Sequence, residues 1–145
     1  MDELDALQSA IGYTFADRSL LVQALTHPSY LGEHKEQSSN QRMEYLGDAV
    51  LELAVSTYLY SRLPAKAEGE LSRIRAAIVS EQPLSVAARE IDLGRYLYLS
   101  QGERAGGGAE KASILSDALE AVFGAIYLDS GFEPACAAVL RLMDA

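Results

Sequence analysis

The stretch Asn40-Gln41-Arg42-Met43-Glu44-Tyr45-Leu46-Gly47-Asp48-Ala49-Val50-Leu51 guides the interpretation of the whole sequence. Its apolar residues recur at helical spacing and predict an amphipathic helix to about Leu59; they are Met43, Leu46, Val50, Leu53 and Ala54. Glu44 and Asp48 are four residues apart, so they face the same side of that helix. Like charges at this spacing destabilise an isolated helix unless a cation lies between them. The pair therefore either solvates one helix face or binds a cation.

A second acidic pair lies in residues 112–128, a segment that is apolar nearly all round and predicts a buried helix. Its only charged residues are Asp117 and Glu120, whose spacing of three places them on one face. Two buried carboxylates require protonation, a cationic partner or a metal. Oxygen ligands suit Mg²⁺ or Mn²⁺. The spacing alone leaves a four-carboxylate metal site and two incidental acid pairs equally open.

The composition fits one globular domain, because 145 residues with 49% hydrophobic content can build a proper core. The acidic N-terminus lacks the features of a signal peptide, and no apolar stretch approaches the length of a membrane span. The single cysteine, Cys136, can form no internal disulfide, which fits a reducing compartment. We expect a cytoplasmic protein that is not bound to a membrane.

The remaining sequence predicts further helices, and we expect an all-α fold with at most a trivial extended segment. These helices are expected at residues 2–10, 18–26, 68–79, from Pro83 onward and 134–143. A buried stripe is expected on the helix at 68–79, formed by Leu71, Ile74, Ala77 and Ile78. Residues 102–108 are glycine-rich and predict a mobile loop. We expect a structural role for His27, and solvent exposure for His34 and Glu52.

The sequence resembles the bacterial ribonuclease III family of double-stranded-RNA endonucleases in several motifs that follow one another in order. Residues 40–51 resemble the family signature, and residues 117–120 resemble its second acidic motif. The opening and middle of the family pattern are matched by residues 11–15, 24–30, 68–72 and 75–76. The resemblance implies a ribonuclease III endonuclease-domain fold for residues 1–145, without the double-stranded-RNA-binding domain of full-length members. The fit up to the last helix favours an excised domain over a naturally short form.

The resemblance also implies a metal site. Glu44, Asp48, Asp117 and Glu120 fall on its four carboxylate positions, with Glu44, Asp117 and Glu120 binding Mg²⁺ directly. Mn²⁺ is expected to substitute for Mg²⁺, and no organic cofactor is implied. Asp48 and Glu120 are the residues most closely tied to catalysis. The implied reaction is hydrolysis of double-stranded RNA to 5′-phosphate and 3′-hydroxyl ends, in the processing of ribosomal and other RNA precursors.

Substrate contacts and a partner subunit follow from the same resemblance. Gln41, where many members have Glu, and Glu68 are expected to line the cleavage valley. Arg104 and Lys111, on either side of the glycine loop, are candidates for phosphate contacts. The resemblance implies a homodimer in which the signature helices pack across a twofold axis and Tyr45 plugs a pocket on the partner. The alternative is that Tyr45 belongs to the core of its own chain.

The net charge of −9 and the sequence pI near 4.6 contrast with the basic surfaces that grip phosphate backbones. Bound divalent cations would invert the local field at an acidic site. We therefore expect weak RNA affinity for this chain alone. Two other interpretations stay open: a noncatalytic relative that dimerises or binds RNA, and an all-α scaffold with incidental acid pairs. Noncatalytic relatives are expected to have lost acids from the site, whereas this sequence retains all four.

Overall fold

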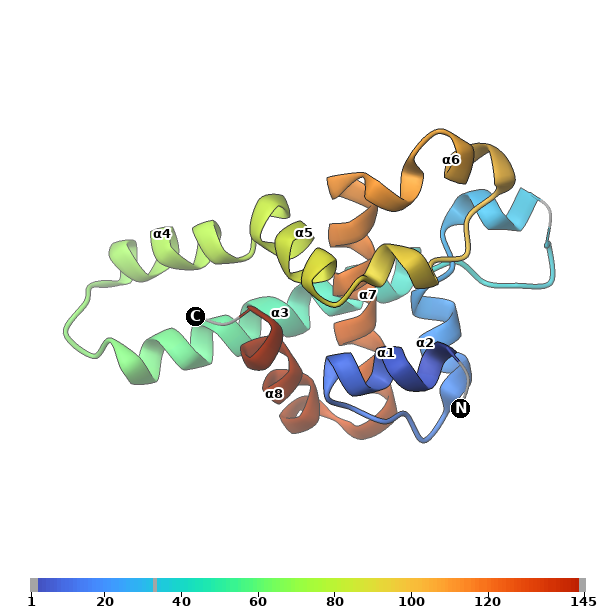
Figure 1. Ribbon diagram of the computed structural model, residues 1–145. Coiled ribbons are helices and arrows are strands. Elements are labelled where there is room, and N and C mark those ends of the chain that lie inside the picture. Colours follow the sequence, from blue (N-terminus) through green and yellow to red (C-terminus); the bar gives the residue numbers. More distant parts are fainter. Residues whose placement is uncertain (1–2, 33, 144–145) are drawn as a thin grey trace.

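The computed structural model describes residues 3–32 and 34–143, and the regular elements in these ranges are helices (Figure 1). The prediction of an all-α fold is confirmed. The α-helices are α1 (Glu3–Ile11), α2 (Arg18–Ala24), α3 (Gln41–Arg62), α4 (Glu68–Ile78), α5 (Glu81–Glu90), α6 (Gln101–Ala105), α7 (Ala112–Ser130) and α8 (Phe132–Met143). Three short 3-10 helices join them: η1 (Pro28–Gly32), η2 (Leu93–Tyr96) and η3 (Gly108–Glu110). None of the helices in the described ranges has both the length and the apolar character needed to cross a membrane.

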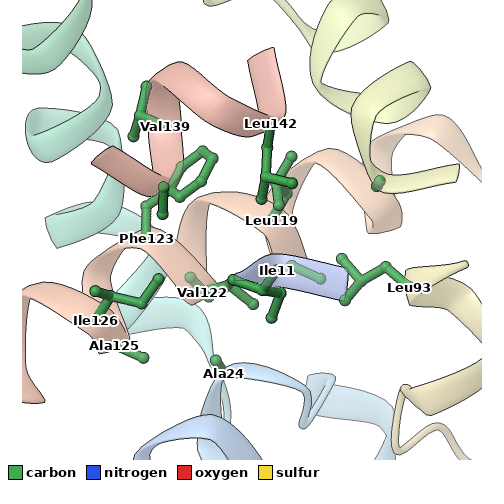
Figure 2. Packing of buried hydrophobic residues seen from close by; sticks show 14 of the residues in the cluster. Ile11, Ala24, Leu93, Leu119, Val122, Phe123, Ala125, Ile126, Val139 and Leu142 are labelled. Carbon is green, nitrogen blue, oxygen red and sulfur yellow. The ribbon is translucent and has the colours of Figure 1, made fainter. Parts of the chain in front are cut away.

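Helix α7 forms the centre of the molecule, and α2, α3, α5 and α8 pack around it (Figure 1). Its side chains are buried on nearly every face, as the apolar sequence predicts. Figure 2 shows Leu119, Val122, Phe123 and Ile126 of α7 among side chains from the surrounding elements, namely Ile11, Ala24, Leu93, Val139 and Leu142. Close packing of this kind holds the helices that meet α7 in fixed positions.

The segment between α1 and α2 is attached to the C-terminal end of this central helix. Near the end of α7, the Asp129 carboxylate accepts hydrogen bonds from the N–H groups of Ala16 and Asp17, each at 2.9 Å. Asp17 caps α2 as predicted, because its side chain accepts the N–H of Ser19 at 3.1 Å. Helix α2 ends at Ala24, two residues earlier than predicted, and residues 25–27 instead pair with Tyr98 through backbone hydrogen bonds.

Helices α3 and α4 continue beyond the α7 core as a two-helix arm (Figure 1). The predicted buried stripe of α4 is wrong, because Leu71, Ile74 and Ile78 are only half-buried and Ala77 is exposed. The packing partners of α4 are α3 and α5, which leave part of its surface uncovered.

Glu52 is partly exposed, as expected, with 44% of its side chain accessible, but it also lies near a cation that the sequence did not indicate. Its carboxylate lies 3.8 Å from Nε of Arg75 on α4, and Nη1 of the same guanidinium donates to Ser56 Oγ at 2.9 Å. His34 differs from expectation: it is half-buried, and its ring stacks on Tyr30 with centroids 3.8 Å apart.

The glycine-rich segment 102–108, predicted as a loop, contains most of α6. Ser100 begins that helix, because its Oγ accepts the N–H of Glu103 at 3.0 Å. Gly107 adopts a φ of +83°, a conformation suited to glycine, and leads into η3. Lys111 then contacts Glu103 at 2.9 Å, which closes the segment on itself.

Candidate metal centre

Helices α3 and α7 cross with their backbones in contact at two buried glycines, Gly47 and Gly124. A Cβ atom placed on Gly47 would lie 1.7 Å from the carbonyl oxygen of Glu120. A Cβ atom on Gly124 would lie 2.5 Å from the carbonyl oxygen of Met43. Only residues without a side chain permit so close an approach, so the two glycines fix how the helices cross.

This crossing brings together the four acids that the sequence singles out. One carboxylate oxygen from each of Glu44, Asp117 and Glu120 lies within 4.8 Å of the other two. Asp48, one turn after Glu44, makes a side-chain hydrogen bond with Glu120. The structure therefore forms a three-carboxylate group that could hold a metal ion, with Asp48 bonded to one of its members.

A hollow of about 590 Å³ opens at this group between α3 and α7. Glu120 lies at its base, with only 8% of its surface exposed, whereas Asp48 and Gln41 on the rim are exposed. Gln41 lines the same hollow as Glu44 and Asp48. The hollow gives a substrate a direct approach to the carboxylates.

The surroundings of Glu120 disfavour a negative charge. Burial is the largest cause, and it raises the pKa of Glu120 to about 9 together with the hydrogen bond and charge of Asp48. The charges of Glu44 and Asp117 act in the same direction. A carboxyl group in this position holds a proton at neutral pH unless a cation compensates its charge.

The other two members of the group are affected in the same direction. Burial, followed by the charge of Asp117 and a hydrogen bond with it, raises the pKa of Glu44 to about 7. Burial also raises the pKa of Asp117, although its hydrogen bond with Glu44 opposes the change. These carboxyl groups share protons in place of a positive charge.

The donor set fits a hard divalent cation. All the available ligand atoms of Glu44, Asp117 and Glu120 are carboxylate oxygens, which Mg²⁺ and Mn²⁺ prefer over sulfur and imidazole. Within residues 3–32 and 34–143, no Lys or Arg forms an ion pair with these acids. A divalent cation would supply the missing positive charge and release the shared protons.

The other residues predicted to contact RNA do not line the hollow at this group. Glu68 is on α4, where its carboxylate accepts a hydrogen bond from Ser72 Oγ at 3.3 Å. Arg104 donates to the backbone carbonyl of Leu97, so part of its guanidinium stabilises the fold. Lys111 forms the ion pair with Glu103 and stands directly before α7. Within one chain these residues do not line the hollow of the carboxylates.

His27 is held by backbone contacts, which agrees with the structural role expected for it. Its Nδ1 accepts the N–H of Ser29 at 3.0 Å, and its own N–H donates to the carbonyl of Tyr98 at 3.0 Å. In the neutral ring the proton is therefore on Nε2. Burial lowers the pKa of His27, against the charges of Glu103 and Asp117, which raise it.

Two features that position the site were missed by the sequence analysis. The first is the glycine pair at the helix crossing; a glycine inside a helical pattern signals close backbone approach. The second is Asn40, which is buried and ties α2 to the start of α3. Its Nδ2 donates to the carbonyl of Ala24 at 3.0 Å, and its N–H donates to Thr26 at 2.8 Å. Together these contacts fix the first turn of α3, which carries Glu44.

A second hollow, of about 400 Å³, lies beside Tyr45 on the outer face of α3 and was also missed by the sequence analysis. Tyr45 is 83% exposed, so it is not a core residue of its own chain. The hollow is largely apolar and is lined by Leu20, Gln23, Arg42, Met43, Tyr45, Leu46 and Leu128.

Comparisons with known proteins agree with this architecture. A family model described as Ribonuclease-III-like matches residues 17–145. The chain is 48% identical over 145 residues to ribonuclease 3 of Syntrophobacter fumaroxidans, covering 99% of this chain and 60% of that protein. It is 46% identical to ribonuclease 3 of Pelotomaculum thermopropionicum, covering 98% of this chain and 60% of that protein. The chain thus spans about 60% of the length of these curated relatives.

Solved structures show the same fold. The crystal structure of the nuclease domain of ribonuclease III from Campylobacter jejuni superposes with a TM-score of 0.92 at 45% identity, covering 99% of this chain and 95% of that one. A second structure of that nuclease domain, described by its structural flexibility in the region involved in dimer formation, gives the same TM-score and covers 98% of this chain and 96% of that one. Because the family model matches most of its length, this chain belongs to the ribonuclease-III-like family.

Proposed function

We propose that this chain is the catalytic domain of a divalent-metal-dependent endoribonuclease that cleaves double-stranded RNA in the cytoplasm. The convergence of four carboxylates at the α3–α7 crossing carries this proposal. An acidic group that requires a cation, in a chain of the ribonuclease-III-like family, favours hydrolysis of phosphodiester bonds. The expected products carry 5′-phosphate and 3′-hydroxyl ends, and the expected substrates are ribosomal and other RNA precursors.

In this proposal Glu44, Asp117 and Glu120 hold Mg²⁺, for which Mn²⁺ can substitute. Once bound, the ion supplies a Lewis acid that activates water and neutralises charge on the scissile phosphate. Asp48 orients Glu120 through the hydrogen bond between their side chains. The exposed carboxylate of Asp48 also lies on the rim of the hollow, where it can accept a hydrogen bond from an attacking water.

Gln41 stands on the same rim, and its amide can donate or accept a hydrogen bond from the RNA backbone. A-form RNA is recognised mainly through its phosphates and 2′-hydroxyls. The acidic chain provides few cations for this purpose, so we expect weak binding that falls steeply with salt.

The decisive experiment is cleavage of a perfect RNA duplex at low salt with Mg²⁺, beside EDTA and Glu120→Gln controls. Glu120→Gln keeps the size of the side chain but removes a charged metal ligand. We expect duplex cleavage that EDTA abolishes and that the substitution reduces by at least about 100-fold. Normal cleavage by the folded variant would contradict the site assignment. A folded wild-type protein that binds duplex RNA with Mg²⁺ but does not cut it would favour the noncatalytic interpretation.

The proposed enzyme is a homodimer that pairs the outer faces of its two α3 helices. In a twofold dimer the same surface occurs on both subunits, so a protruding Tyr45 and the adjacent apolar hollow can complement each other. Leu128 on the edge of that hollow is 52% exposed and offers further apolar surface. Two sites related by a twofold axis also match the two antiparallel strands of a duplex. Since Glu68 lies outside the hollow of its own chain, it can contribute to the cleavage valley only across this dimer.

Tyr45→Ala tests the dimer. We expect sedimentation at low protein concentration to show a shift from dimer to monomer, because an aromatic anchor at an interface contributes about 2 kcal/mol or more. Tyr127→Ala is a suitable control, since Tyr127 is also exposed but does not line the hollow. A Tyr45→Ala protein that remains dimeric at the same concentration would refute this role.

A further inference from the structure

The ion pair between Lys111 and Glu103 lies at the start of α7, the helix that carries Asp117 and Glu120. Lys111 Nζ lies 2.9 Å from Glu103 Oε2, and Lys111 is the residue at which α7 begins. Asp117 follows on the second turn of that helix. The lysine side chain is 52% exposed, whereas the glutamate side chain is 23% exposed. The cation of this pair is thus the member that solvent reaches more easily.

Glu103 is held in place by the contacts of α6. Its N–H donates to Ser100 Oγ at 3.0 Å, and the N–H of Ser100 donates to Ser29 Oγ at 3.0 Å. Its side chain also passes over Gly108, where a Cβ atom would lie 2.6 Å from Glu103 Cγ. The carboxylate therefore has a fixed position, against which the longer lysine side chain folds.

His27 places this pair within electrostatic reach of the metal centre. Burial lowers the pKa of His27, the charges of Glu103 and Asp117 raise it, and the charge of Lys111 lowers it further. The His27 imidazole thus lies close enough to Glu103, Lys111 and Asp117 for their charges to shift its pKa. A cation freed from Glu103 would add a positive charge at the start of the helix that carries Asp117 and Glu120.

We propose that Glu103 competes with RNA for Lys111: its carboxylate binds the lysine in the free protein and yields it to a backbone phosphate when a duplex binds. This competition rests on the proposed function, because it would regulate how the RNA substrate binds. Carboxylate and phosphate oxygens accept the same charge-assisted hydrogen bonds from an ammonium group. Because a partly exposed ion pair contributes little stability, one anion can replace the other at small cost.

The masking of a cation has a larger effect in this chain than in a basic protein. Twelve Lys and Arg residues face twenty-one acidic ones, so each cation near the site carries much of the attraction for RNA. With Lys111 neutralised, the free protein presents a more acidic surface at the start of α7. Only a ligand that places a phosphate at Lys111 recovers its charge.

Binding of a fluorescent RNA duplex with Mg²⁺ tests this proposal, with the Glu120→Gln substitution present throughout so that the duplex stays intact. Glu103→Gln is expected to decrease Kd by about two- to fivefold, the range expected for loss of a partly exposed ion pair. Lys111→Gln is expected to increase Kd, and to reduce the slope of log Kd against log salt by about 0.7–0.9 for one lost phosphate contact.

Two further variants isolate the competition. Glu110→Gln makes the same change of charge in the same segment, but Glu110 makes no ion pair among those of the described residues. We expect its Kd to change much less than that of Glu103→Gln. When Lys111 is already glutamine, Glu103→Gln should no longer improve binding, since the competition requires the lysine.

Equal effects of Glu103→Gln and Glu110→Gln would overturn the proposal, because they would show a general effect of net charge. An improvement by Glu103→Gln that persists without Lys111 would overturn it as well. If the wild-type protein cuts duplex RNA and the variants give either of these contradicting results, the competition for Lys111 is refuted but the proposed function is not. A wild-type protein that neither binds nor cuts the duplex refutes the proposed function, and the competition with it.

Discussion

The crossing of α3 with α7 and the arm formed by α3 with α4 use the same long helix in opposite ways. At the crossing, backbones touch through Gly47 and Gly124, and the α7 side chains around it are buried. Along the arm, α4 has no fully buried residue, and Tyr60 of α3 is 78% exposed. One end of α3 is therefore held by direct backbone contact with α7, whereas the other packs through partly exposed side chains of α4.

The difference shows how rigidity is distributed along one helix. Three carboxylates must stay within 4.8 Å of one another in spite of their mutual repulsion, and close packing at the crossing supplies the necessary constraint. The arm has no such group to hold together. Its contacts with α3 include the exposed pair of Arg75 and Glu52, a kind of interaction that contributes little. Stability is concentrated where the acids meet.

The largest effect should come from Gly47→Ala. Its Cβ atom would meet the backbone of Glu120, which cannot move without displacing α7, so we expect a loss of about 4 kcal/mol or more in the free energy of unfolding. Gly69→Ala on α4 is the matched control, because no atom lies within 4 Å of its added methyl group. That variant should gain up to about 1 kcal/mol from helix propensity. Urea denaturation measures both; similar losses would contradict the contrast between crossing and arm.

Shortening one leucine in each region should give a smaller difference in the free energy of unfolding between the crossing and the arm. Leu119→Ala on α7 removes a fully buried side chain, and we expect it to cost about 3–5 kcal/mol through lost burial and a cavity. Leu71→Ala on α4 removes a half-buried side chain that leaves little cavity, so a cost of about 1 kcal/mol is expected. Thermal unfolding of the two variants provides the test. Equal costs would mean that the arm is packed as tightly as the core.

The smallest effect is a dependence of stability on pH that arises at the crossing. In the unfolded chain Glu120 loses its proton near pH 4.5, whereas in the folded protein its pKa is about 9. Between these values the folded state binds the extra proton, so the free energy of unfolding decreases as pH rises. The raised pKa of Glu44, about 7, adds to the decrease. In EDTA we expect the free energy of unfolding to fall steadily as pH rises from 5 to 8.

Glu120→Gln provides the control for this dependence, since an amide does not titrate. Its stability in EDTA should change less between pH 5 and pH 8 (a window chosen from the raised pKa values) than that of the wild-type protein. Mg²⁺ should reverse the wild-type decrease, with the larger gain at the higher pH, where the ligands ionise more readily. A wild-type stability that does not fall over this range would show that the crossing does not raise the pKa values of Glu44 and Glu120.

The two helices that cross are predicted well from the sequence, because the local residue spacing and the burial of apolar side chains both favour a helix there. The spacing of Glu44 and Asp48 on one helix, and of Asp117 and Glu120 on another, places each pair on one face. That the two pairs meet follows from the family resemblance, whereas the structure shows the physical cause in Gly47 and Gly124. Periodicity describes one helix at a time and cannot give the angle or distance between two.

The errors occur where long-range contacts override local tendencies. The run Gly106-Gly107-Gly108 predicts a loop, but Ser100 begins a short helix before it and the ion pair of Glu103 with Lys111 closes it. Glu52 is partly exposed as predicted, but its periodic position gives no sign that Arg75 from α4 lies close to its carboxylate. The stripe of α4 has the right period, but its depth of burial depends on how much surface α3 and α5 cover.

The contact between Gly47 and Gly124 also fixes when the site can form. The two halves of the carboxylate group are separated by some seventy residues, so neither half of the chain contains a binding site. During synthesis, the group cannot assemble until α7 has left the ribosome and closed a loop of that length against α3, a slow kind of step. A nascent chain therefore lacks this group of carboxylates until α7 has been made, so a shorter chain that ends before α7 could not bind a cation there.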